Sequence, residues 1–151
     1  MRLFSLLVLA GMLALATTSA QAGSVEQPPF AAKVSITSAP DGPFSATGHS
    51  LCVSGQAATT FNFAVGSLPD GVKLVVGKTF RCDDDSGTFD MVLSVRIRFV
   101  AGGPPYPTSF RWLITDGTGQ FEGLQGSGTG VGVITNGEFV DSYTGRVSID
   151  H

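Results

Sequence analysis

The sequence has few of the residues that metal, redox and nucleic-acid chemistry use. Among 151 residues there are two cysteines, two histidines and one tryptophan, and only 14% of the residues are charged. No cluster of lysine or arginine is present, which argues against nucleic acid and against anionic membrane surfaces as partners. A zinc site would need more cysteine or histidine nearby than His49 and His151 supply, so we predict no metal and no cofactor.

Only one long hydrophobic run is present, and it lies at the N-terminus. Arg2 precedes an apolar stretch, residues 3–16, and residues 20–22 (AQA) place small side chains where a signal peptidase needs them. The run is shorter than the roughly 20 apolar residues of a transmembrane helix. We therefore predict a signal peptide over residues 1–22, cleavage before Gly23, and a secreted or periplasmic protein with no membrane span in its mature part.

The mature chain, residues 23–151, is predicted to form a single domain. Its 129 residues are a typical domain length and are enough to bury a sizeable core. Without Arg2 the chain carries 8 basic and 12 acidic residues, which gives a net charge of −4.

Both cysteines, Cys52 and Cys82, lie in this mature part. In an oxidising compartment a single disulfide is the default, and a reactive thiol or a metal ligand is the alternative. Closing a loop of about 30 residues stabilises a domain by roughly 3–4 kcal/mol in the chain-entropy model.

A two-residue period, typical of β-strands, runs through the mature chain. It is clearest in residues 89–99 (FDMVLSVRIRF), where every odd-numbered residue is apolar. Shorter runs of the same kind occupy residues 33–38, 59–65, 72–80, 109–115, 131–134 and 143–149. Turn signals separate them, including Asn-Gly at 136–137, and no capped helical period of useful length is present. About eight strands at this spacing predict an all-β antiparallel barrel, with a β-sandwich as the alternative.

The alternation also predicts which side chains face inward. In residues 89–99 the apolar side should face the core, which leaves Arg96 and Arg98 outside, where they could join Asp90 and Arg111 in a surface charge ladder. If that polar face pointed inward instead, the arginines would hold an anionic or oxygen-rich ligand.

Seven large apolar side chains on the expected inner faces are candidates to line a ligand cavity. These are Phe61, Phe63, Met91, Leu93, Val95, Phe110 and Trp112. The alternative is that they simply fill the core, because the interior of an eight-stranded barrel is just wide enough for side chains or for one small ligand.

Residues 116–132 (DGTGQFEGLQGSGTGVG) are unusually rich in glycine. They do not match the G-x-G-x-x-G pattern of a phosphate-binding loop, and no helix follows them. Gly126, Gly128, Gly130 and Gly132 recur at every second position, so they should lie on one face of a strand. Such a stripe permits close backbone approach or a sharp bend, as at a barrel corner.

The segment 112–128 (WLITDGTGQFEGLQGSG) resembles the glycine-rich hairpin of exported bacterial β-barrel proteins that are similar to the allene oxide cyclase and dirigent group. Segments 82–89 (CDDDSGTF) and 141–147 (DSYTGRV) are similar to the same set. The resemblance implies an eight-stranded antiparallel barrel, and plant members of the group cyclise an epoxide or steer radical coupling inside it. Their acid and arginine site residues match no position here, so the resemblance assigns no catalytic residue.

Two other motifs lack parts that their chemistry requires. Residues 48–52 (GHSLC) carry Cys52 where a nucleophile elbow needs glycine, and no helix follows. The triplet at 83–85 (DDD) could open a calcium loop, but Thr88 and Ser94 stand at its sixth and twelfth positions. A solvated acidic turn is the simpler interpretation.

Three hypotheses for the function follow. We favour a non-enzymatic exported β-barrel that binds a small apolar ligand, because the predicted inner face is almost wholly apolar and catalysis would need a titratable residue there. The second hypothesis is an allene-oxide-cyclase-like or dirigent-like cyclase or isomerase acting in the same cavity. The third is an envelope or matrix structural protein. The oligomeric state is not predicted by any of these features.

Overall fold

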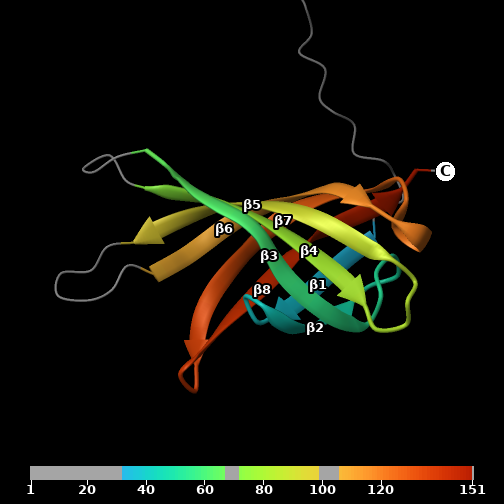
Figure 1. Ribbon diagram of the computed structural model, residues 1–151, viewed down its shortest axis with the longest axis horizontal. Coiled ribbons are helices and arrows are strands. Elements are labelled where there is room, and N and C mark those ends of the chain that lie inside the picture. Colours follow the sequence, from blue (N-terminus) through green and yellow to red (C-terminus); the bar gives the residue numbers. More distant parts are fainter. Residues whose placement is uncertain (1–31, 67–71, 99–105, 151) are drawn as a thin grey trace, which may run out of the picture.

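Eight antiparallel strands close into a barrel in which every strand pairs with its chain neighbours and the last pairs with the first (Figure 1). This computed structural model describes residues 32–66, 72–98 and 106–150, so the predicted signal peptide and Phe99 lie outside the described residues. The strands are β1 (Ala32–Ser38), β2 (Gly42–Thr47), β3 (Ser54–Val65), β4 (Lys73–Cys82), β5 (Thr88–Arg98), β6 (Tyr106–Gly117), β7 (Leu124–Thr135) and β8 (Glu138–Ile149). The prediction of an antiparallel eight-stranded barrel is confirmed.

Strand β5 shows how the alternation produces the barrel wall. Met91, Leu93 and Val95 are buried inside, Ile97 is half-buried, and Arg96 is exposed outside. The predicted orientation is therefore confirmed for these residues, while the side chain of Arg98 lies outside the described ones. A shift of register by one residue would exchange the two faces and bury charge.

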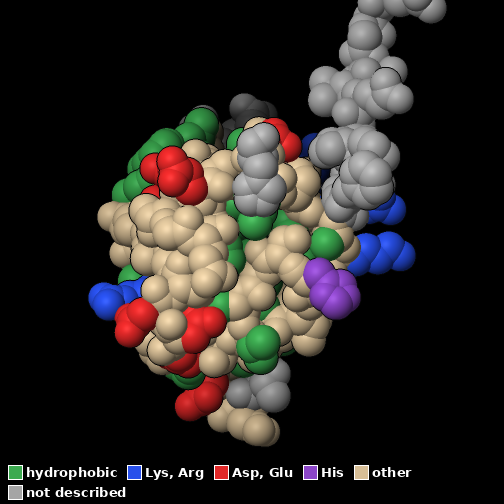
Figure 2. Space-filling model, turned by 90° about the vertical axis from the view of Figure 1, so that its right-hand side faces the viewer, with side chains coloured by type: hydrophobic (Ala, Val, Ile, Leu, Met, Phe, Trp, Pro, Cys, Tyr) green, Lys and Arg blue, Asp and Glu red, His purple; other side chains and the backbone are tan. Residues whose placement is uncertain are grey.

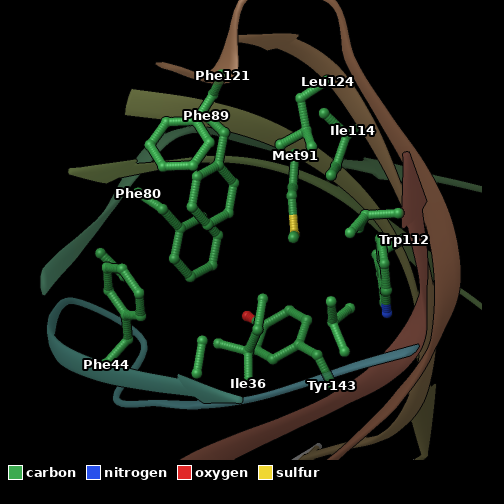
Figure 3. Close-up of a cluster of buried hydrophobic side chains, with 14 of the residues drawn as sticks. Ile36, Phe44, Phe80, Phe89, Met91, Trp112, Ile114, Phe121, Leu124 and Tyr143 are labelled. Carbon is green, nitrogen blue, oxygen red and sulfur yellow. The ribbon is translucent and has the colours of Figure 1, made fainter. Parts of the chain in front are cut away.

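One end of the barrel is filled by an aromatic core (Figure 3). The rings of Phe80 and Phe89 are stacked with their centroids 4.9 Å apart, and Phe44 meets Phe80 edge-on at 5.2 Å. At the same end a disulfide joins Cys52, which precedes β3, to Cys82 at the end of β4, with the Cα atoms 5.9 Å apart. The prediction that the two cysteines pair is confirmed.

The glycine stripe of β7 faces the barrel interior, where two aromatic rings lie across it. Phe110 is the register partner of Gly130, and Trp112 is the partner of Gly128. A Cβ added at Gly130 would lie 2.2 Å from the Phe110 ring, and one at Gly128 would lie 2.6 Å from the Trp112 ring. Only glycine leaves room for these rings, so the stripe accommodates a close approach of side chains rather than the backbone approach that we predicted.

The prediction that Phe61 and Phe63 face inward is wrong. A β-bulge lies between Thr59 and Phe61, where the pairing of β3 with β4 shifts by one residue. The bulge reverses the inward and outward positions of the rest of the strand. Phe61 and Phe63 consequently stack on each other on the outer surface, 45% and 52% exposed, with Phe61 lying over Gly77.

The end of the barrel opposite the disulfide is spread open. Strands β6 and β7 pair only from Phe110–Gly130 to Leu113–Ser127, and the described pairing of β2 with β3 covers only Gly42 to Ser45. Figure 1 shows the consequence at its left-hand side, where β3 to β6 continue together while the β7–β8 hairpin turns away. The side chains near this open end are therefore less completely enclosed than the aromatic core.

Candidate functional site

A group of three polar side chains that contact one another lies inside the barrel, between the aromatic core and the open end. Lys78 projects inward from β4, and Asp141 and Tyr143 project inward from β8, where their spacing of two places them on one face. Lys78 is 3% exposed, Asp141 7% and Tyr143 0%. A buried lysine and a buried aspartate are rare in proteins unless they are paired.

The three side chains satisfy one another and the nearby backbone. The Nζ atom of Lys78 lies 3.7 Å from Oδ2 of Asp141 and donates a hydrogen bond of 2.5 Å to the carbonyl oxygen of Pro40. The hydroxyl of Tyr143 donates to the same Oδ2 at 3.3 Å. We call Lys78, Asp141 and Tyr143 the interior polar cluster.

Burial pushes each member of the interior polar cluster toward its neutral form. It lowers the pKa of Lys78 below the ordinary value, which the charges of Asp141 and Asp41 oppose. It raises the pKa of Asp141, which the Lys78 charge and the hydrogen bond from Tyr143 oppose. Burial and the neighbouring Asp141 charge both raise the pKa of Tyr143. In Lys78 and Asp141 the charge of the partner therefore opposes the effect of burial and favours the charged form.

A cavity of about 160 Å³ borders the interior polar cluster on its open-end side. Its walls are mostly apolar and come from β3, β4, β5, β6 and β8 and from Pro40. Its polar lining residues are Thr59, Asn62, Lys78 and Asp141. The apolar wall residues are Pro40, Leu74, Val76, Leu93, Val95, Phe110 and Phe139. A cavity of about this size, when lined by aliphatic and aromatic groups, accommodates a molecule as large as benzene.

Part of this wall consists of residues that the sequence predicted to face a cavity. Leu93, Val95 and Phe110 line the cavity, whereas Met91 and Trp112 are buried in the core and do not border it. The expectation of an almost wholly apolar interior is wrong, because Lys78 and Asp141 face inward.

A signal for these two residues was present in the sequence. Lys78 lies two residues from each of the inward-facing residues Val76 and Phe80, and Asp141 lies two residues from Tyr143. Residues two apart on a strand share a face. The alternation that predicted the apolar wall therefore also predicts these inward charges.

The acidic turn between β4 and β5 uses its three carboxylates separately. Ser54 donates a hydrogen bond to Asp83 at 2.9 Å, the backbone N–H of Ser86 donates to Asp84 at 3.0 Å, and Asp85 lies 3.7 Å from Arg81. Within the described ranges no three metal-ligating side chains converge. In the same ranges the structure has no helix of the length and apolarity that crossing a bilayer requires.

Comparison with known proteins gave no match: no family model fits the chain, and no curated protein or solved structure matches it. The fold does not by itself identify a function, because eight-stranded barrels serve many unrelated ones. The geometry of the cavity and of the interior polar cluster is therefore the basis for assigning one.

Proposed function

We propose that this chain is an exported β-barrel protein that binds a small, mainly apolar ligand carrying one carbonyl or hydroxyl group. The observation that carries the proposal is the apolar cavity with Lys78 and Asp141 on its wall. Most small-molecule sites combine apolar walls with a few placed polar groups in this way. Export is supported by the N-terminal apolar run with its AQA pattern and by the disulfide between Cys52 and Cys82.

The polar group of the ligand follows from the hydrogen-bonding capacity of the wall. An ammonium group has three donors. Lys78 donates one N–H to the carbonyl oxygen of Pro40, and its ammonium group faces Oδ2 of Asp141. At least one N–H donor is therefore left for a ligand carbonyl. Oδ2 of Asp141 is shared by Lys78 and Tyr143, so Oδ1 is the carboxylate oxygen that a ligand hydroxyl would meet.

The test uses cyclohexanone and cyclohexane as probes, because the two rings differ only in the carbonyl group. We expect both to raise the melting temperature and cyclohexanone to bind more tightly in a calorimetric titration. Leu93→Phe should abolish binding by filling the cavity. Leu113→Phe is the matched control, because Leu113 is 54% exposed on the outer surface.

The double variant Lys78→Met with Asp141→Leu separates binding from stability. Replacing a buried ion pair by apolar residues of similar volume is often neutral for stability or stabilising. The double variant should therefore fold and bind both rings equally. Undiminished binding to Leu93→Phe, or an unchanged preference for cyclohexanone in the double variant, would contradict the proposal.

The interior polar cluster also favours a second candidate, a cyclase or isomerase like those that the sequence resemblance implies. Such chemistry needs a titratable group at the cavity, and Asp141, whose pKa is raised by burial, is one. Turnover of an unsaturated fatty-acid epoxide that is lost in Asp141→Asn but retained in Leu113→Phe would favour catalysis. Binding of cyclohexanone without turnover of the epoxide would favour the first candidate.

A further inference from the structure

A groove lies in the outer surface of the barrel, and Phe110 separates it from the cavity by lining both. The groove has a volume of about 590 Å³, and its charged lining residues are Lys73, Arg96 and Arg111. Hydroxyl groups complete the lining, from Ser94, Ser109, Thr129, Ser142 and Thr144. The groove lies where β6 and β7 diverge beyond the Phe110–Gly130 pair, a separation that is visible in Figure 1.

A second hollow continues the groove around the barrel. It is lined by Lys33 and Arg146, and it shares Thr129 and Thr144 with the groove. Together the two hollows cross β4, β5, β6, β7, β8 and β1. Because neighbouring strands lie about 4.8 Å apart, five such steps give a path of about 24 Å over the surface. We call this path, with Lys73, Arg96, Arg111, Arg146 and Lys33 along it, the basic track.

All five charged side chains that line the basic track are basic, in a mature chain that carries a net charge of −4. The two ion pairs within the described residues, Lys78–Asp141 and Arg81–Asp85, involve none of the five. Figure 2 faces the end of the barrel where β4 and β5 are joined. Acidic side chains (red) gather on this end, and most basic ones (blue) lie at its margins.

The strand register places like charges directly opposite each other along the basic track. Lys73 is the cross-strand partner of Arg96, and Lys33 is the partner of Arg146. Like charges in such positions destabilise a sheet. An arrangement that costs stability in the free protein is expected where a ligand of opposite charge compensates for it.

We propose that the basic track binds a linear acidic polysaccharide. A chain with carboxylates on successive sugar rings would meet cations from strand after strand, and its hydroxyl groups would meet the serines and threonines. Single-stranded nucleic acid fits less well, because its bases need aromatic side chains to stack on, and the one aromatic lining residue, Phe110, is buried. A flat lipid surface would not enter a hollow.

The test measures binding of the purified protein to a polygalacturonate oligomer long enough to span the track. A neutral glucose oligomer of equal length and a short galacturonate oligomer are the comparisons. Arg96→Gln combined with Arg111→Gln should weaken binding of the long oligomer about tenfold or more, and binding should weaken with added salt. Arg81→Gln is the matched control, since Arg81 is exposed and lies beside Asp85, off the track.

A second variant tests whether the whole track is used. Lys33→Gln with Arg146→Gln should weaken binding of the long oligomer and leave the short one unchanged if the short oligomer occupies only the groove. Circular dichroism should show every variant folded, because all the changed side chains are exposed. Equal binding by the Arg96 and Arg111 double variant and by Arg81→Gln would overturn the proposal. So would tighter binding to single-stranded DNA, or to phosphatidylglycerol vesicles, than to polygalacturonate.

Discussion

Asp141 stabilises the protein mainly through its effect on Lys78. Asp141→Asn leaves the lysine buried without its carboxylate, a change that typically costs about 3–5 kcal/mol near neutral pH. Asp141 normally opposes the lowering of the Lys78 pKa by burial, so this pKa should fall further in the variant.

The lowered pKa of Lys78 determines whether the stability of the Asp141→Asn variant rises or falls with pH. A lysine whose pKa in the folded state lies below its ordinary value of 10.5 binds fewer protons in the folded state than in the unfolded state. Stability therefore rises with pH between those two values. The variant should have a lower free energy of unfolding than the native protein. We expect this difference, measured by urea unfolding, to become smaller as the pH is raised toward 10.5. A deficit that grows with pH would contradict this account.

Leu93 and Leu113 are a matched pair for measuring how much an inward-facing leucine contributes to the free energy of unfolding. Leu93 is 2% exposed on the cavity wall, whereas Leu113 is 54% exposed on the outer face of β6. Leu93→Ala should lower the free energy of unfolding by roughly 2–5 kcal/mol, and Leu113→Ala should change it by less than about 0.5 kcal/mol. Equal losses in denaturant unfolding would mean that the assigned faces are wrong.

Among the elements, β7 depends most strongly on glycine. Gly130→Ala would place a methyl group against the ring of Phe110, and overpacking of this kind costs about 1–3 kcal/mol. Ser127→Ala on the exposed face of the same strand should be nearly neutral. Combining Gly130→Ala with Phe110→Leu should recover part of the loss in thermal unfolding. A Gly130→Ala protein as stable as the native one would show that the ring does not cover this glycine.

Element by element, the sequence predicted strands best where alternation was uninterrupted. The long strand β5 was predicted closely, because nothing breaks its period. Strand β2 lies in none of the predicted runs, and β7 was predicted to start at Val131 rather than Leu124. The bulge before Phe61 could not be foreseen, because it depends on how β3 pairs with β4.

For the molecule as a whole, the disulfide should be a major source of stability. Cys52→Ser should lower the free energy of unfolding by roughly 3–4 kcal/mol, because the crosslink limits the unfolded chain. Adding a reductant to the native protein should reproduce this loss and should not destabilise the variant further. Two reactive thiols in a titration of the native, unreduced protein would refute the pairing.

The barrel could be predicted from the sequence, but most of the surface chemistry could not. The inward orientation of Lys78 and Asp141 could have been predicted from the two-residue alternation of their strands alone. The sequence placed Arg96 and Arg111 together on the outer face, but it did not place Lys73, Lys33 or Arg146 with them. These residues come together only through the register of the strands. Charge clusters of this kind depend on pairing that no local pattern records.

The most direct test of the central claim is a crystal structure of the protein soaked in cyclohexanone. We expect the ring between Leu93 and Phe110, with its oxygen within hydrogen-bonding distance of Nζ of Lys78. A structure in which neighbouring side chains fill the cavity, or in which cyclohexanone binds only on the outer surface, would contradict that claim.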